Sequence, residues 1–308
     1  MAFATVYVVW GSTYLAIRVA VETMPPFLMA GSRFLVAGAM LFVWLRLHGV
    51  VMPGKSQWFH ATIAGVLMLL GGNGLVVWAE QTVSSSLAAL LVALTPVWFA
   101  LLEWLRPAGK RPATSTWIGI VVGFIGVALL VTGQNSSSVN VSHNPWGVAA
   151  LVLAGLFWAA GSLWARYHAK PESPWMNAAL QMICGGAALL LVAIIQREPA
   201  RFHFAQVSTQ AWLSFLYLIV FGSWIGFSAY VWLLKVSTPS RVATYAYVNP
   251  VIAVLLGHLM LNEPLGLRAL WAAVVILAGV IITTWPTREQ LGLKRVADLR
   301  AASTLAEP

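Results

Sequence analysis

Aromatic and uncharged polar side chains inside long apolar segments are the residues of this chain best suited to bind a ligand. The sequence holds 16 tryptophans in 308 residues, and several lie well inside apolar segments, away from the ends where interfacial tryptophans gather. A lipid-facing position would explain any one of them. Pairs at three- and four-residue spacing share a helix face, so together they predict a cavity with aromatic walls and neutral hydrogen-bonding groups. The residues predicted to line it and bind a ligand are Trp10, Ser12, Tyr14, Asn73, Trp78, Trp98, Trp158, Ser162, Tyr245 and Asn249.

Two prolines occupy matching places in the two halves of the chain. Pro96 and Pro250 each lie inside an apolar segment, where a proline cannot bond to the carbonyl four residues earlier. These carbonyls, of Val92 and Ala246, must then face protein, water or a ligand. The pair predicts kinks that bend during gating or expose backbone to a ligand, and a static kink held by packing is an equally good interpretation.

One charged residue, Arg33, lies well inside an apolar segment and away from its ends. Arg33 either attracts a ligand carboxylate or bonds helix-end carbonyls and fixes its own helix. No acidic residue lies in the middle of a segment; Glu80 and Glu103 come nearest, and we interpret them as end-capping ion pairs. A protein that exchanges protons for cationic drugs needs a buried carboxylate, so this class is not favoured.

Motifs for catalysis and cofactors are missing from the sequence. There is no Gly-x4-Gly-Lys-Ser/Thr loop for nucleotide phosphates and no His-Glu-x-x-His for zinc. The single cysteine, Cys184, lies in an apolar segment and offers neither a disulfide nor a metal site. We therefore predict no enzyme activity, no catalytic residue, no cofactor and no metal.

The composition requires a lipid bilayer as the main partner of the chain. Hydrophobic residues make up 60%, charged residues only 9%, and the mean hydropathy is +0.81; a soluble domain carries about a quarter charged residues. The net charge of +9 forms no basic block, so no nucleic acid is predicted. Most of the apolar segments approach the roughly 20 residues that a membrane-spanning helix needs. The ten segments are Phe3–Ile17, Phe27–Leu45, His60–Ala79, Val83–Leu105, Thr116–Thr132, Trp146–Ala165, Trp175–Ile195, Ala211–Leu234, Val242–Leu261 and Leu267–Trp285.

The positive charges between these segments predict the orientation. If the N-terminus is inside, 13 of the 18 Lys and Arg residues lie on the inner side and four on the outer side, and the remaining one is Arg33 inside a segment. Positive charge concentrates on the cytoplasmic side of membrane proteins. Both termini are therefore predicted to be cytoplasmic.

The two halves of the sequence repeat each other. Gly11-Ser12 matches Gly161-Ser162, 150 residues later, and Thr95-Pro96-Val97 matches Asn249-Pro250-Val251, 154 residues later. Five segments per half is an odd number, so the second half must be inverted in the membrane, as in carriers that alternate access around a midplane site. The predicted units are residues 1–134, residues 135–286 and a cytoplasmic tail of residues 287–308.

Several short motifs carry a family resemblance. They are Trp10-Gly11-Ser12-Thr13, Arg33-Phe34 after Pro25-Pro26, Thr95-Pro96 and the turn Asn262-Glu263-Pro264. With them the chain resembles the EamA-type ten-helix permeases of the drug/metabolite transporter superfamily, from the first segment to Trp285. The resemblance implies an all-α inner-membrane exporter whose central cavity is lined by spans one, three, four, six, eight and nine. Span two is peripheral in that family, so the structural interpretation of Arg33 is favoured.

The function predicted from these features is secondary transport. We expect export of small neutral or zwitterionic metabolites, with amino acids, including aromatic ones, as the leading candidates, because aromatic walls suit flat or apolar side chains. A passive channel or facilitator, a multidrug exporter and a membrane enzyme or scaffold are the alternatives. The expected location is a bacterial inner membrane, with the protein as a monomer or weak dimer.

Overall fold

The computed structural model describes residues 1–79, 81, 83, 88, 91–107, 109, 111–132, 145–261 and 267–284, without the side chains of residues 14, 18, 130–132, 253, 254, 257–261, 269 and 284. The backbone in these ranges is helical with short connections, and no strand occurs in them. The predicted all-α class is therefore confirmed. The Tyr14 side chain, Glu80, the turn at 262–264 and the tail at 287–308 lie outside the described residues.

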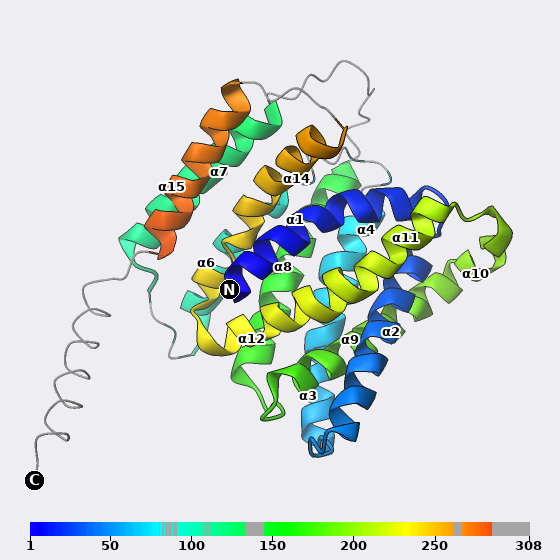
Figure 1. The fold of residues 1–308 in the computed structure, drawn as a ribbon. Helices are drawn as coiled ribbons and strands as arrows, with labels where there is room; N and C mark the ends of the chain where they lie inside the picture. Colours follow the sequence, from blue (N-terminus) through cyan, green and yellow to red (C-terminus); the bar gives the residue numbers. More distant parts are fainter. Residues whose placement is uncertain are drawn as a thin grey trace, which may run out of the picture.

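The helices of the described chain follow one another with few long interruptions (Figure 1). Their bounds are α1 Ala2–Val21, α2 Pro26–Leu47, α3 Lys55–Gly65, η1 Val66–Gly74, α4 Leu75–Ala79, α6 Thr95–Leu105, α7 Thr114–Thr132, α8 Pro145–Tyr167, α9 Pro174–Ile195, α10 Glu198–Arg201, η2 Phe204–Gln206, α11 Thr209–Tyr217, η3 Leu218–Phe227, α12 Ser228–Val236, α13 Pro239–Val242, α14 Tyr245–Leu261 and α15 Leu267–Thr284.

Six helices in the described ranges are long and apolar enough to cross a bilayer. They are α1, α2, the continuous helix α3–η1–α4 (Lys55–Ala79), α8, α9 and the continuous helix α11–η3–α12 (Thr209–Val236). At 1.5 Å per residue, their 20 to 28 residues cover the roughly 30 Å of hydrocarbon. Shorter apolar helices lie at Thr114–Leu129 and Leu270–Thr283. The total of ten spans stays a prediction.

The helix pairs have a two-fold pattern. α2 packs against α9 and α7 against α15, and the latter pair lies side by side at one edge of the molecule (Figure 1). α1 contacts η3 and α14, while α8 contacts η1 and α6. Exchanging α1 with α8, η1 with η3, and α6 with α14 carries each of these contacts onto another, as two equivalent halves would.

The paired helices α2 and α9 run antiparallel. A Cβ atom at Gly31 would lie 2.8 Å from Leu190, and one at Gly38 would lie 2.8 Å from Met182, so positions rise along α2 as they fall along α9. Only small residues allow helices to approach this closely. Equivalent helices of inverted halves must run antiparallel, and the inversion itself stays a prediction.

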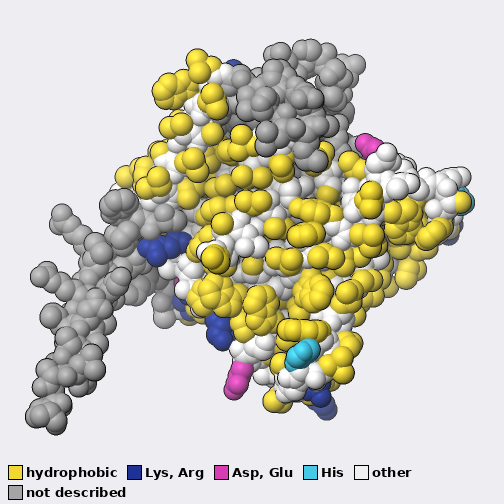
Figure 2. All heavy atoms as spheres, viewed as in Figure 1, with side chains coloured by type: hydrophobic (Ala, Val, Ile, Leu, Met, Phe, Trp, Pro, Cys, Tyr) yellow, Lys and Arg dark blue, Asp and Glu magenta, His cyan; other side chains and the backbone are white. Residues whose placement is uncertain are grey.

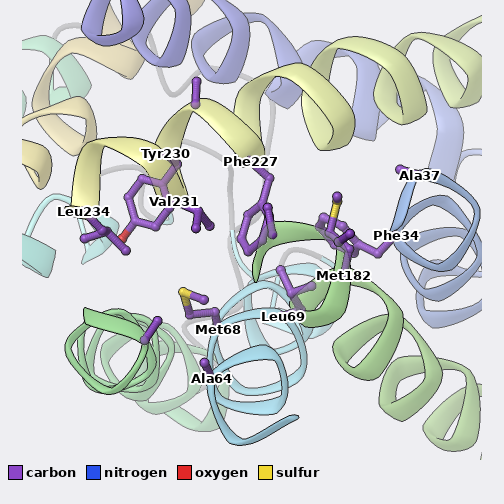
Figure 3. Close-up of a cluster of buried hydrophobic side chains, with 14 of the residues drawn as sticks. Phe34, Ala37, Ala64, Met68, Leu69, Met182, Phe227, Tyr230, Val231 and Leu234 are labelled. Atoms are coloured by element: carbon purple, nitrogen blue, oxygen red, sulfur yellow. The ribbon is translucent and has the colours of Figure 1, made fainter. Parts of the chain in front are cut away.

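The hydrophobic core lies between α2, η1, α9 and the η3–α12 helix. Figure 3 shows Phe34, Met68, Met182, Phe227 and Tyr230 converging there from these different elements. Met68, Met182 and Tyr230 are completely buried. This packing holds η1 and η3 in place on either side of the site described below.

The outer surface is apolar along most of its height. Large hydrophobic side chains such as Val43, Ile194, Leu216 and Trp271 are more than half exposed. Figure 2 shows hydrophobic side chains covering most of the visible face, with Lys and Arg side chains mainly along its left and lower margins. An exposed apolar surface with charge at its margins fits a helical bundle surrounded by lipid.

Candidate functional site

A cavity lies between the helices that form the two-fold pattern. Its empty volume, which includes open solvent at its mouth, is about 860 Å³. Residues of α1, η1, α4, α6, α8, η3 and α14 line it, which are the parts of the chain expected to do so. α2 also contributes, through Arg33 and Phe34, although its span was expected to be peripheral.

Aromatic rings form one wall of this cavity. Trp10 and Trp158 meet edge to face with their centroids 5.5 Å apart. Trp10 also lies 4.9 Å from Tyr230 and 5.0 Å from Tyr245, while Phe227 lies 6.4 Å from Trp158. These separations are those of favourable aromatic pairs, so the rings stabilise one another as a cluster.

Hydrogen bonds behind the rings fix their orientation. The Trp10 indole N–H donates to the carbonyl of Gly222 at 3.1 Å, and the Trp158 indole N–H donates to the Tyr230 hydroxyl at 2.8 Å. Ser162 lies 2.6 Å from the same hydroxyl and also donates to the Trp158 carbonyl. Because both indole N–H groups already have partners in the protein, the apolar faces of the rings are left for a ligand.

Two glycines in widened helical turns make room for the tryptophans. η1 and η3 are π-helical segments, which are frequent at functional sites. A Cβ atom at Gly72 would lie 2.8 Å from the Trp158 ring, and one at Gly226 would lie 2.7 Å from the Trp10 indole nitrogen. The two glycines are 154 residues apart, the same offset as the proline pair. The wall therefore has the two-fold pattern of the whole fold.

The polar groups that line the cavity are few. Arg33 is 3% exposed and donates to the side-chain oxygen of Asn73 at 3.1 Å, in place of the helix-end carbonyls expected for it. Thr95 and Asn249 add a hydroxyl and an amide. With its amide oriented by its neighbours, Asn249 donates to the carbonyls of Tyr7 and Tyr245 at 3.3 and 3.0 Å.

The two prolines have different surroundings. Pro96 lies in the first turn of α6, directly after a turn at Ala93–Leu94 that separates α6 from the helical residues 91 and 92, so it begins a helix and does not lie inside one. Its role in gating stays a prediction. The Val92 carbonyl accepts a bond from the Thr95 hydroxyl at 2.6 Å and is not left free. Pro250, in contrast, lies inside α14, as expected.

Five of the ten predicted ligand residues, Trp10, Asn73, Trp158, Tyr245 and Asn249, line the cavity together. Other predicted residues lie behind the wall or elsewhere. The Ser12 hydroxyl is 2.6 Å from that of Tyr217, and Ser162 supports Tyr230 from behind. Trp98 packs over Gly155, and Trp78 packs against the hydrophobic core.

Phe227, Phe34, Thr13 and Thr95 line the cavity but were missed as ligand residues, and the completely buried Tyr230 was missed as their support behind the wall. Phe34 and Thr95 were quoted only within motifs. Phe227 and Tyr230 are three residues apart and share a helix face. That spacing could have identified them.

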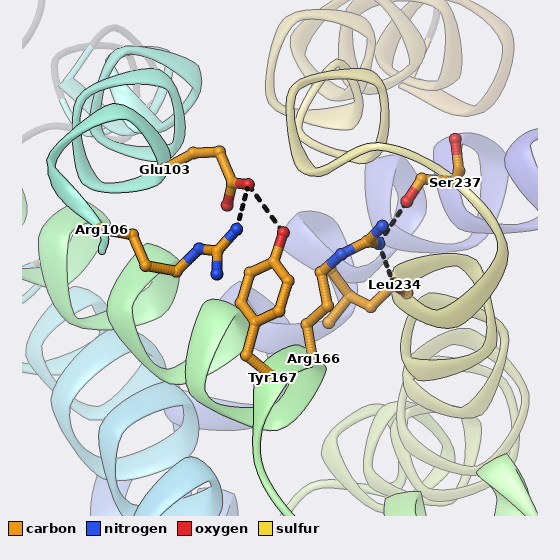
Figure 4. Close-up of polar contacts among 6 residues, drawn as sticks. All are labelled: Glu103, Arg106, Arg166, Tyr167, Leu234 and Ser237. Atoms are coloured by element: carbon orange, nitrogen blue, oxygen red, sulfur yellow. Dashed lines mark hydrogen bonds and ion pairs between the residues drawn. The ribbon is translucent and has the colours of Figure 1, made fainter. Parts of the chain in front are cut away.

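A polar cluster lies at the C-terminal end of α8 (Figure 4). The Tyr167 hydroxyl donates to Glu103 at 2.7 Å, and Arg106 lies 3.4 Å from the same carboxylate and stacks on the Tyr167 ring at 3.8 Å. Arg166 donates to the carbonyls of Leu234 and Ser237, at the C-terminal end of α12. The cluster joins α6, α8 and α12 at this end.

The described residues contain no group of three or more His, Cys, Asp or Glu side chains placed to hold a metal ion. The chemistry offered by the cavity is accordingly stacking, one cation and a few neutral hydrogen bonds.

Comparison with known proteins gives a consistent result. The model of the EamA-like transporter family matches residues 1–132 and 145–285. The uncharacterized inner membrane transporter YedA of Escherichia coli strain K12 is 37% identical over 285 residues, which cover 92% of this chain and 89% of YedA. The uncharacterized transporter YvbV of Bacillus subtilis strain 168 is 24% identical, with 94% and 92% covered. A solved crystal structure superposes with a TM-score of 0.75 at 18% identity, covering 92% of this chain and 95% of its own, which shows the shared fold.

Proposed function

This chain belongs to the EamA-like transporter family, and we propose that it is a secondary transporter exporting small neutral or zwitterionic metabolites, aromatic amino acids among them. Transport proceeds by alternating access around the cavity. The observation that carries the proposal is the meeting of Trp10 and Trp158, one from each half, at the wall of a site between the halves. Motion of one half against the other would open this site to either side of the membrane.

We further infer which side the cavity faces. The basic residues Arg46, Lys55, Arg166 and Lys235 lie at one end of the helices, and the positive-inside rule assigns this end to the cytoplasm. Several lining residues come from the opposite portions: Ile17 is near the outer end of α1, and Arg33 is in the outer part of α2, while Tyr245 and Asn249 lie in the cytoplasmic part of α14. Val77 likewise lies near the outer end of α4, and Thr95 is the first residue of α6, at the outer end of that helix. We infer an outward-facing state.

Closure on the inner side is supported by contacts between helices. The Tyr7 and Thr244 hydroxyls, on α1 and just before α14, lie 2.6 Å apart. The Glu103–Tyr167 and Arg166–α12 contacts in Figure 4 lie deeper toward the cytoplasmic end. Opening to the cytoplasm must separate these partners. A hydrogen bond contributes about 0.5–1.5 kcal/mol net, weak enough to break in a transport cycle.

Transport by a carrier and passage through a facilitator differ in a measurable way. A channel needs a continuous polar path, whereas the aromatic cluster bounds this cavity on its inner side. Purified protein in proteoliposomes preloaded with unlabelled phenylalanine should accumulate external radiolabelled phenylalanine transiently, because a carrier exchanges faster than it returns empty. Uptake without this counterflow would contradict alternating access and favour a facilitator.

The tryptophan pair gives the matched test of the site. Trp10→Ala and Trp158→Ala each remove one aromatic contact with a ligand, worth about 0.5–1.5 kcal/mol. We expect roughly two- to tenfold weaker transport of phenylalanine or tryptophan and a smaller loss for alanine. Trp44→Ala, at an exposed position on α2, should leave transport unchanged. Equal losses in all three variants would contradict a stacking role.

Uptake into proteoliposomes is also measured for a panel of radiolabelled neutral amino acids, hexose phosphates and quaternary ammonium drugs. If a quaternary ammonium drug were the best substrate in this panel, the multidrug alternative would replace the proposal. The lining residues that the structure describes include no carboxylate to hold such a cation.

A further inference from the structure

Arg33 is the feature of the cavity that the proposed function leaves unused. It is almost completely buried, and it makes no ion pair with any described residue. Its one hydrogen-bond partner there is the Asn73 oxygen, and its Nε atom has none. A guanidinium has five N–H donors, so most of its capacity is free. An unpaired buried charge at this depth costs free energy that an incoming anion would recover.

Among the described residues, the carboxylate at the start of α2 is already bound elsewhere. Glu198 is buried and accepts hydrogen bonds from the backbone N–H groups of Phe27 and Leu28 at 3.3 and 2.7 Å. It therefore caps α2 and stabilises the positive end of the helix dipole. Phe27 precedes Arg33 by six residues, or roughly 9 Å along a helix. Glu198 thus bonds the helix end and leaves the guanidinium uncompensated.

The surroundings of Arg33 hold its guanidinium in one place. Asn73 bonds it from η1, and the ring of Phe34 lies 4.4 Å from its central carbon. The ring centroids of Phe34 and Phe227 lie 6.3 Å apart, and those of Phe227 and Trp158 lie 6.4 Å apart. A row of aromatic rings thus connects the cation with the tryptophan wall.

We propose that Arg33, positioned by Asn73, binds the carboxylate of the substrate, and that this carboxylate is the group the transporter requires. Resting on the proposed function, this narrows the substrate class to monocarboxylates with an aromatic or apolar body. The guanidinium fork matches a carboxylate in two-point contact. The body lies along Phe227 and the tryptophans. A second carboxylate finds no second cation among the described lining residues, and an amine without a carboxylate finds no anion.

The test compares four ligands of one shape on the purified full-length protein. Phenylalanine and 3-phenylpropanoate carry the carboxylate; phenylalaninamide and phenethylamine lack it. Binding is measured by the thermal shift of the detergent-solubilised protein, and transport in proteoliposomes. The two carboxylates should bind at least about tenfold more tightly than the amide and the amine, because hydrogen bonds between charged groups are the strong ones.

Variants assign the effect to Arg33. Arg33→Gln should abolish the preference for the carboxylates, and Arg33→Lys should keep part of it. Asn73→Asp places a carboxylate beside the guanidinium and should block phenylalanine binding while phenethylamine binding is unchanged or stronger. Arg46→Gln is the matched control, because Arg46 lies on the same helix but its guanidinium bonds the Val50 carbonyl at the surface. This variant should retain the full preference for the carboxylates.

The two proposals fail in different ways. If the wild-type protein moves the amide and the amine as well as the acids, carboxylate recognition is wrong and transport of small metabolites stands. The same conclusion follows if Arg33→Gln folds and keeps the preference. If the wild-type protein moves none of the ligands in the metabolite panel, the proposed function is wrong and the carboxylate site falls with it.

Discussion

The Tyr230 hydroxyl is the oxygen on which the aromatic wall depends. It accepts the indole N–H of Trp158 and bonds the Ser162 hydroxyl, and its residue is completely buried. Its ring also lies within 6 Å of Trp10 and Tyr245. One oxygen therefore couples α8 to α12 and sets the angle of a ring that we propose contacts substrate.

Tyr230→Phe tests this coupling. The change keeps the ring and removes the acceptor of a buried indole N–H, and such an unsatisfied group costs about 1–3 kcal/mol. We expect a lower thermal unfolding temperature in detergent and a higher KM for aromatic substrates. Tyr167→Phe is the matched control for stability, because its hydroxyl is at the surface. An equal decrease of the unfolding temperature in both variants would contradict the stabilising role of the buried Tyr230 hydroxyl.

Single residues of the site were predictable where their chemistry is unusual for an apolar segment. Trp10, Asn73 and Asn249 were identified in this way, since polar or amphipathic side chains at depth need partners. Trp78 and Trp98 have the same chemistry but face other surfaces, because depth along a segment does not give the face of the helix. Which face points inward depends on tertiary packing, and the π-helical turns shift it further.

Helix ends decide what the two prolines do. Pro96 lies at the start of α6, where the backbone N–H has no intrahelical partner in any case. Pro250 lies inside α14 and removes an internal bond to the Ala246 carbonyl. Sequence could not separate these two cases, because the turn at Ala93–Leu94 has no glycine or proline of its own to mark it.

We therefore predict unequal effects of the two alanine substitutions. Pro250→Ala restores a helical hydrogen bond and straightens α14, so the maximal transport rate should fall severalfold while stability is kept or raised. Pro96→Ala should change either quantity little. Both are measured as initial rates in proteoliposomes and unfolding temperatures in detergent. Equal loss of rate in both variants would reject the structural distinction.

At the scale of the whole molecule, the helical architecture was the most predictable feature. Apolar runs of about 20 residues located the helices, since hydrocarbon thickness fixes their length. The family resemblance came from short motifs together with the number of apolar segments and the repeat at nearly constant offset. The contribution of α2 to the cavity could not be foreseen, because it depends on how far Arg33 reaches across a helix interface. Orientation in the membrane rests on charge asymmetry and is open to a direct test.

That test uses the single cysteine. Cys184 accepts a bond from the Thr62 hydroxyl within the bundle, and Cys184→Ser provides a background without thiols. In whole cells an impermeant maleimide should label Arg201→Cys, whereas Gly54→Cys should react only after permeabilisation, because the positive-inside rule places Gly54 in the cytoplasm. Labelling of both from the same side would contradict the orientation and the outward-facing assignment together.

Arg33 has no counterpart in the second half. α9, the equivalent of α2, carries no charged residue along Pro174–Ile195, although the tryptophans, glycines and prolines around the cavity are doubled. A purely two-fold site would accept a ligand in two degenerate orientations related by the axis. A lone cation removes that degeneracy and gives the site an electrical polarity. In a carrier built this way, the carboxylate of the ligand stays bound near α2 throughout the transport cycle. The helices move relative to the ligand, and the ligand does not have to reorient.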